Sequence, residues 1–119
     1  MANILIIEDD LYHLELLAEI IKFSGNHPFT SNNQEAAFKI VSENAIDLII
    51  TDISLLSGSG LDVIENLQKK KLPIPFIVVS GSTDIEDKQQ AEKLNAIAFL
   101  NKPVNPEALL TLINKMSFK

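Results

Sequence analysis

The chain has 119 residues, of which 46% are hydrophobic and 22% are charged, and its formal net charge at pH 7 is −6. This length and composition predict one folded domain over residues 1–119 with a hydrophobic core, and they exclude a disordered chain. The sequence has no cysteine, which excludes disulfides and thiolate metal sites, and it lacks the stripe of lysine and arginine that neutralises nucleic-acid phosphates.

Five short apolar runs are predicted to be strands. Continuous β-branched runs of this length are typical of parallel strands that are covered by helices on both faces. In chain order the runs are Asn3–Ile7, a weaker Pro28–Thr30, Asp47–Thr51, Pro75–Ser80 and Ala96–Leu100.

The segments between these runs carry apolar residues at helical spacing. Leu14, Leu17 and Ile21 define the inward face of the first segment, which stops at the turn-forming residues Ser24–Asn26. The segment Ser82–Leu94 is polar and charged, so we expect it to be the least buried helix. The other three helices are predicted over Asn33–Ser42, Gly60–Lys70 and Asn105–Met116.

Five strand–helix repeats predict an α/β fold: a doubly wound, five-stranded parallel sheet with helices on both faces. Open α/β sheets bind their ligands just outside the carboxyl ends of the strands. The polar residues that follow the strands are therefore the first candidates for a functional site. They are Glu8, Asp9, Asp10, Asp52, Ser80 and Lys102.

Several carboxylates at one sheet edge repel one another and raise each other's pKa values unless a cation lies among them. A hard divalent cation with oxygen ligands, Mg²⁺, suits such a cluster. A carboxylate beside Mg²⁺ can act as a nucleophile toward phosphorus and form an aspartyl phosphate. A nearby ammonium and a hydroxyl can then hold the other phosphoryl oxygens. This constellation predicts phosphoryl chemistry.

Four segments at the ends of predicted strands form a recognisable series: ILIIEDD (4–10), DLIITD (47–52), IVVSG (77–81) and FLNKP (99–103). In their order and separations they resemble the receiver domain of two-component response regulators, and the resemblance covers essentially the whole chain. It implies the flavodoxin-like strand order 2-1-3-4-5. It also implies a signalling module, similar to chemotaxis receivers, that changes conformation on phosphorylation.

The resemblance implies a role for each matching acidic residue. Asp52 is expected to accept a phosphoryl group from a histidine kinase or a phosphotransfer protein. Mg²⁺ is expected to bind Asp9 and Asp52 directly, Glu8 through water, and the backbone carbonyl of Ser54. Asp10 is expected to cap the first helix, where its charge interacts favourably with the helix dipole, rather than to bind metal.

Three further residues are expected to respond to the phosphoryl group. Ser80 would donate a hydrogen bond to it, Lys102 would pair with it, and Phe99 would occupy the aromatic switch position. The bond between Lys102 and Pro103 is often cis in this family. The resemblance also implies that the domain catalyses only its own phosphorylation and dephosphorylation and is not a turnover enzyme.

Some positions depart from the family's commonest pattern. Ser80 replaces the more usual threonine but keeps the hydroxyl, and Leu56 stands where proline is common. The stretch Ser57–Gly60 is therefore expected to be more mobile than usual. We assign no functional role to His13, which we expect to be exposed, or to His27.

The alternative is an aspartyl-nucleophile phosphohydrolase of the haloacid-dehalogenase type. Such an enzyme needs a second aspartate two residues after the nucleophile, where this chain has Ser54, and 119 residues leave no room for a substrate cap. A flavodoxin-like flavin binder would share the architecture, but the acids Glu8–Asp10 would repel its phosphate. No G-x-x-x-x-G-K-[ST] motif occurs, which excludes a P-loop nucleotide enzyme.

The sequence also predicts the setting in which the protein works. Its apolar runs are too short to span a bilayer and no basic leader precedes the first run, so a cytoplasmic location is expected. No output domain follows the last predicted helix, so the chain either acts alone on a downstream protein or is the receiver of a longer regulator. We expect no direct binding to nucleic acid or to a membrane.

Overall fold

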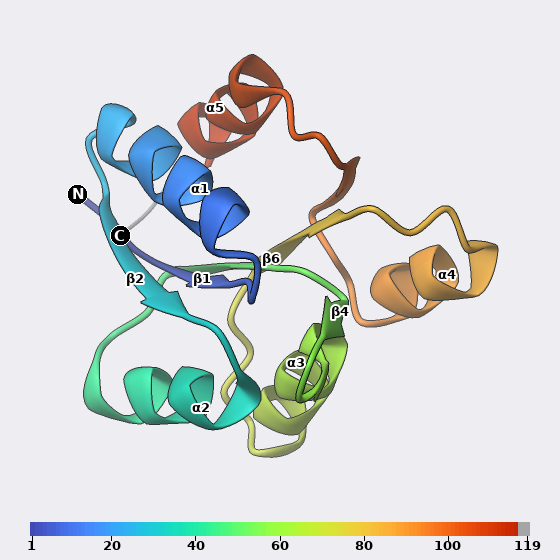
Figure 1. The fold of residues 1–119 in the computed structure, drawn as a ribbon. Coiled ribbons are helices and arrows are strands. Elements are labelled where there is room, and N and C mark those ends of the chain that lie inside the picture. Colours follow the sequence, from blue (N-terminus) through green and yellow to red (C-terminus); the bar gives the residue numbers. More distant parts are fainter. Residues whose placement is uncertain (117–119) are drawn as a thin grey trace.

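The computed structural model describes residues 1–116 and arranges them around a five-stranded parallel sheet (Figure 1). The apolar runs form the strands because their side chains can be buried on both faces. The strands are β1 (Asn3–Ile7), β2 (His27–Ser31), β3 (Leu48–Thr51), β6 (Phe76–Ser80) and β7 (Ala98–Asn101). They lie in the order β2-β1-β3-β6-β7, with every neighbouring pair parallel. The predicted order 2-1-3-4-5 is confirmed, since β6 and β7 are the fourth and fifth strands of this sheet.

Each helix begins after a polar side chain that accepts hydrogen bonds from amides of the first turn. The helices are α1 (Leu11–Phe23), α2 (Gln34–Glu43), α3 (Gly60–Lys69), α4 (Ile85–Lys93) and α5 (Pro106–Lys115). Asp10 caps α1, as predicted. Helix α4 begins at Ile85 rather than at Ser82 because Asp84 is its cap. Within residues 1–116 no helix combines the length and the hydropathy needed to cross a bilayer.

Alternate residues of the strands face two separate hydrophobic cores. Ile4 and Ile6 of β1 point to the side covered by α1 and α5, whereas Leu5 and Ile7 point to the side covered by α2, α3 and α4. Figure 1 shows α1 and α5 on one side of the sheet and α2 and α3 on the other. Packing on both faces fixes the strands, and it therefore fixes the residues that follow them.

A short antiparallel hairpin that the sequence does not predict follows β3. It consists of β4 (Ser54–Leu55) and β5 (Gly58–Ser59). Gly58 has a φ of 138°, a conformation that glycine adopts without strain. Gln34 of α2 donates from Nε2 to the Ser59 carbonyl oxygen at 2.8 Å. Strands of two residues are too short to leave a periodic pattern, which is why the sequence does not reveal them.

The expectation that His13 is exposed is wrong. The residue is half-buried, and its buried Nδ1 atom has no hydrogen-bond partner within the described part of the chain. His13 lies four residues before the buried Leu17, so the two share one face of α1. His27 is exposed, and its ring meets that of Phe29 edge-on with the centroids 4.7 Å apart.

Gly60 permits the close approach of α3 to the end of β3. A Cβ atom at this position would lie 1.9 Å from the Asp52 carbonyl oxygen and 2.1 Å from Thr51 Oγ1. The Gly60 amide also donates to the Ile53 carbonyl oxygen at 2.9 Å. Only glycine leaves room for this contact, so α3 begins directly against the strand that leads to Asp52.

We expect Gly60→Ala to lower the free energy of unfolding by about 2 kcal/mol or more, because the added methyl group forces backbone atoms apart. Gly81→Ala is the matched control, since apart from chain neighbours no described atom lies within 4 Å of its Cβ position. Its expected change is about 0.5 kcal/mol or less. Urea denaturation of both variants measures the two values. Equal losses would show that the Gly60 contact does not constrain the fold.

Candidate functional site

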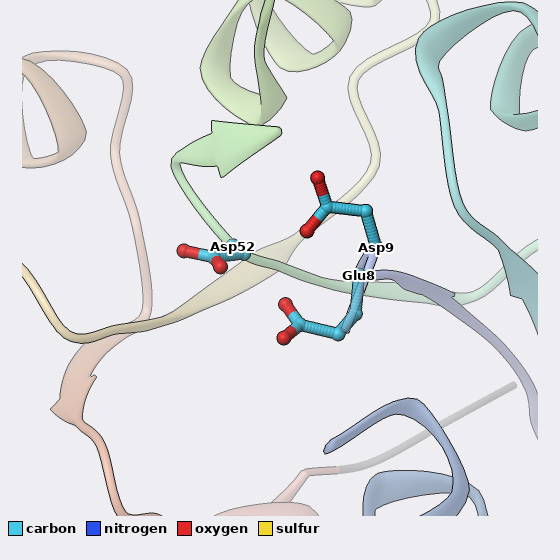
Figure 2. Close-up of side chains that lie close together, drawn as sticks. All are labelled: Glu8, Asp9 and Asp52. Carbon is cyan, nitrogen blue, oxygen red and sulfur yellow. The ribbon is translucent and has the colours of Figure 1, made fainter. Parts of the chain in front are cut away.

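Three carboxylates meet at the carboxyl edge of the sheet (Figure 2). Glu8 and Asp9 follow β1 and Asp52 follows β3, and these strands lie side by side with Ile7 opposite Thr51. One carboxylate oxygen from each residue lies within 4.8 Å of the others. The structure thus brings together three of the carboxylates that follow the predicted strands.

Lys102 lies between two of these carboxylates. Its Nζ atom is 2.6 Å from Glu8 Oε1 and 2.9 Å from Asp52 Oδ2. The Lys102 amide donates to the Ser80 carbonyl oxygen at 2.9 Å, and the bond between Lys102 and Pro103 is cis, as predicted. The side chain of Glu8 is 1% exposed and that of Lys102 is 18% exposed. Water and salt therefore screen these ion pairs much less than they screen surface pairs.

The buried setting controls the protonation of Glu8. Burial, together with the nearby Asp52 carboxylate, raises the pKa of Glu8 from 4.5 to about 7 even though the hydrogen bond from Lys102 opposes the change. Burial alone lowers the pKa of an ammonium, but the hydrogen bonds to Glu8 and Asp52 outweigh it and raise the pKa of Lys102 above 10.5. Lys102 therefore stays charged at neutral pH, whereas Glu8 is near its titration midpoint.

The cluster carries more negative charge than Lys102 neutralises. When Glu8 is ionised, three carboxylates and one ammonium leave two negative charges, which match the charge of one divalent cation. Glu8 Oε2 is buried and has no hydrogen-bond partner among residues 1–116. Ligands that are all oxygen atoms suit a hard cation. The residues Glu8, Asp9 and Asp52 could therefore hold a divalent metal ion.

The hairpin is tied to this cluster by two backbone amides. The Leu56 amide donates to Asp9 Oδ2 at 2.6 Å, and the Ser54 amide approaches Asp52 Oδ1 at 3.4 Å. Asp9 is consequently engaged with the hairpin and not with Lys102. Neither amide contact is predicted from the sequence, because a backbone N–H is present at almost every position and carries no signature.

Ser80 is buried at the end of β6, but its hydroxyl makes no hydrogen bond to the carboxylates in the described chain. Its Oγ atom accepts a hydrogen bond from the Ser82 amide at 3.1 Å. Phe99 of β7 is half-buried, and it lines a groove of about 280 Å³ together with Ser82 and Ile85. Both predicted response residues therefore lie beside the loop that leads from β6 to α4.

Two further residues shape the site although the sequence does not single them out. Thr51 donates from its hydroxyl to the Asp52 carbonyl oxygen at 2.8 Å, and Gly60 packs against the same carbonyl. Both contacts hold the backbone of the central carboxylate. A threonine that ends a strand and a glycine that begins a helix are common in proteins of every class, so no motif points to them.

A family comparison identifies the domain. The model for the response regulator receiver domain matches residues 4–114, which include every residue of the cluster. The chain belongs to the response regulator receiver domain family. It is therefore a signalling domain of two-component systems, and the haloacid-dehalogenase alternative is not favoured.

Relatives in several bacteria support this assignment. The chain is 33% identical to an NtrX-like response regulator of Rickettsia typhi over 115 residues. The aligned stretch covers 95% of this chain and 24% of the relative. It is 28% identical to the response regulator SaeR of Staphylococcus aureus over 116 residues, and this aligned stretch covers 98% of this chain and 50% of the relative. The chain thus spans about a quarter to a half of the length of these relatives.

Solved receiver structures share the fold. A response regulator receiver protein from Pseudomonas putida superposes with a TM-score of 0.91 at 32% identity, covering 97% of both chains. The chemotaxis protein CheY4 of Vibrio cholerae gives 0.89 at 22% identity, covering 98% of this chain and 99% of that chain. At this lower identity the second comparison supports the fold alone.

The raised pKa of Glu8 predicts how stability depends on pH in metal-free solution. The folded state binds a proton more tightly than the unfolded chain does, so this contribution is complete below pH 4.5 and is lost as the pH rises through about 7. The expected loss is on the order of 1–3 kcal/mol. Glu8→Gln cannot titrate and should lose less stability between pH 4.5 and pH 8.

Urea denaturation of wild type and Glu8→Gln at several pH values, with a chelator present, isolates the Glu8 contribution. All other ionisable groups remain in the variant, so the difference between the two profiles reports Glu8 and its coupling to Lys102 and Asp52. Parallel profiles would contradict the raised pKa.

Proposed function

We propose that this domain accepts a phosphoryl group on Asp52 and that Mg²⁺ bound beside it assists the transfer. The observation that carries the proposal is the Lys102 ammonium, which bridges Glu8 and Asp52 within a cluster of three carboxylates. A cation, acidic metal ligands and a central carboxylate are the groups that transfer to an aspartate requires. Of the three carboxylates, Asp52 alone meets both Lys102 and the hairpin among the described residues.

The chain's own residues support each part of this reaction. Transfer forms a bond between an Asp52 carboxylate oxygen and phosphorus, while the P–N bond of a phosphohistidine breaks. Lys102 donates a 2.9 Å hydrogen bond to the Asp52 carboxylate, which supports its proposed role of pairing with phosphoryl oxygens. Preorganised charge of this kind stabilises the transition state because little rearrangement is needed.

Mg²⁺ would be held by Asp9 and Asp52, by the backbone carbonyl of Ser54 and, through water, by Glu8. When bound, it supplies positive charge next to the phosphoryl oxygens. The uncompensated negative charge of the cluster and the buried Glu8 Oε2 support this assignment. Ser54 opens the hairpin, with only Ile53 between it and Asp52, which supports its place in the proposed ligand set.

The response to phosphorylation is proposed to run through Ser80 and Phe99. Phosphorylation would shift an equilibrium between two conformations, because the phosphoryl group offers new acceptors to Ser80 and Lys102. A Ser80 hydroxyl that turns toward the phosphoryl group leaves the Ser82 amide, to which it is now bonded. Phe99 lies beside that loop and would then move inward. We propose the surface formed by α4, β7 and α5 as the face that partners read.

The proposed setting is a cytoplasmic phosphorelay. The donor would be a histidine kinase or a phosphotransfer protein, and hydrolysis of the aspartyl phosphate would be catalysed by the domain itself. Residues 1–119 are proposed to form one receiver domain. It would act on a separate downstream protein or within a longer regulator, and it would not bind nucleic acid or membrane directly.

We expect acetyl phosphate with Mg²⁺ to add one phosphoryl group to the wild-type chain, as measured by intact mass. Asp52→Asn should remain unmodified because the amide is not a nucleophile toward phosphorus. Asp10→Asn is the matched control, since Asp10 lies at the same sheet edge and asparagine is an equally good helix cap. It should be modified like wild type. Modification of Asp52→Asn, or an unmodified wild type, would refute the assignment.

The Leu56 amide predicts a second measurable effect. Leu56→Pro removes the N–H that donates to Asp9, so the carboxylate becomes free for metal and the affinity for Mg²⁺ should rise about three- to tenfold. Leu56→Ala keeps the amide and should bind Mg²⁺ like wild type. Isothermal titration calorimetry measures both constants. An affinity for Leu56→Pro that is equal to or below that of Leu56→Ala would show that this hydrogen bond does not compete with metal binding.

A further inference from the structure

A groove of about 410 Å³ lies between α2 and α3, away from the acidic cluster. Both helices run back from the carboxyl edge of the sheet, and the groove lies toward their last turns. Its lining includes Phe38, Lys39, Val41, Leu67, Lys70 and Leu72. The floor of the groove is apolar. It includes the buried Leu67 and also Leu72, which is 52% exposed and so available for contact. We call this feature the basic groove.

Lysines concentrate at the basic groove although the whole chain is acidic. Of the ten basic residues, Lys39 and Lys70 line it and Lys71 lies between the lining residues Lys70 and Leu72 in the chain, while the net charge of the chain is −6. Lys69 does not belong to the groove, because it pairs with Glu65 at 3.3 Å and lines a different pocket toward α4. The Lys70 ammonium lies 5.5 Å from the centroid of the Phe38 ring. Among residues 1–116 no carboxylate lies within ion-pair distance of Lys39, Lys70 or Lys71. None of these three lysines is therefore held in an ion pair in the described chain.

Lys71 occupies a backbone conformation that is unfavourable for lysine. It follows the end of α3 with a φ of 61°, where its amide donates to Gln68 and the next amide, that of Leu72, donates to Leu67. This hydrogen-bonded ending usually places glycine at the left-handed position. The corresponding positions after α1 and α4 are Gly25 and Asn95, which tolerate it well. Backbone strain of this kind occurs at functional positions, and here it falls on a charged residue between the groove residues Lys70 and Leu72.

We propose that the basic groove binds an acidic peptide segment of a partner protein that also carries apolar side chains. The apolar floor suits aliphatic or aromatic anchors, and the lysine rim complements aspartate and glutamate. Nucleic acid and anionic lipid suit the groove less well, because the rim is short, contains no arginine and belongs to a chain of net charge −6. The groove lies at the last turn of α3, and Asp52 lies beside the first residue of the same helix. Because α3 has ten residues, these two ends are about 15 Å apart.

The test selects peptides on the intact folded protein. A phage-displayed library of random short peptides is depleted on Lys39→Glu/Lys71→Glu and then selected on wild type. We expect the enriched sequences to combine acidic residues with leucine or aromatic residues. A synthetic peptide of the enriched consensus is then measured by fluorescence anisotropy. Its binding should weaken about tenfold or more on the double variant and should weaken as salt concentration rises.

Two further variants separate the groove from general charge and from folding. Lys93→Glu/Lys115→Glu makes the same charge change at the ends of α4 and α5, and it should bind the peptide like wild type. Lys71→Gly removes one rim charge together with the strain, so it should bind more weakly while unfolding at no lower a urea concentration than wild type.

Each remaining outcome overturns the proposal. The groove is not an acidic-peptide site if no peptide is enriched, if the enriched peptides lack acidic residues, or if both double variants weaken binding equally. A DNA duplex or phosphatidylserine vesicles that bind wild type and lose binding on Lys39→Glu/Lys71→Glu, in the absence of any peptide ligand, would assign the groove to a different partner. Phosphorylation of Asp52 by acetyl phosphate does not depend on these lysines, so this proposal and the proposed function can fail separately.

Discussion

The ion pairs that Lys102 makes with Glu8 and Asp52 hold the functional edge of this domain together. Two of the three carboxylates that follow β1 and β3 are almost fully buried, where like charges repel strongly. The compensating ammonium comes from the end of β7, which is separated from β3 by β6. The sheet order therefore decides whether the charges meet. The hydrophobic cores on both faces then hold the strand ends in place.

This arrangement satisfies the site only in part. One ammonium faces three carboxylates, and Glu8 keeps a buried oxygen without a partner in the described chain. The raised pKa of Glu8 is the measurable sign of this imbalance. An unfavourable charge arrangement of this kind is tolerated at functional sites when the surrounding fold is stable enough to hold the groups in place. A divalent cation would relieve the imbalance, because it would add positive charge among the three carboxylates.

The sequence predicts the fold well because each strand and helix has a local cause. Buried strands carry continuous apolar runs, helices begin at capping side chains, and polar residues directly after strands of a parallel sheet must share one edge. The same logic predicts the cluster of Glu8, Asp9 and Asp52. It does not predict the hairpin at Ser54–Ser59 or the amide that binds Asp9, because these depend on backbone groups. The sequence also does not predict that Ser80 Oγ accepts a hydrogen bond from the Ser82 amide, because the partner of a hydroxyl depends on the folded loop around it.

Helix α3 joins the two surfaces of interest. Its first residue, Gly60, packs against the Asp52 carbonyl, and its ending at Lys71 borders the basic groove. Between them, Leu61, Ile64 and Leu67 are buried against the sheet. A helix that is buried along its length in this way behaves as a rigid element. The contact of Gly60 with the end of β3 therefore helps to position both ends of α3. Because the groove lies at the far end of the helix, a peptide bound there would leave the acidic cluster open. The domain could then receive a phosphoryl group while it holds a partner.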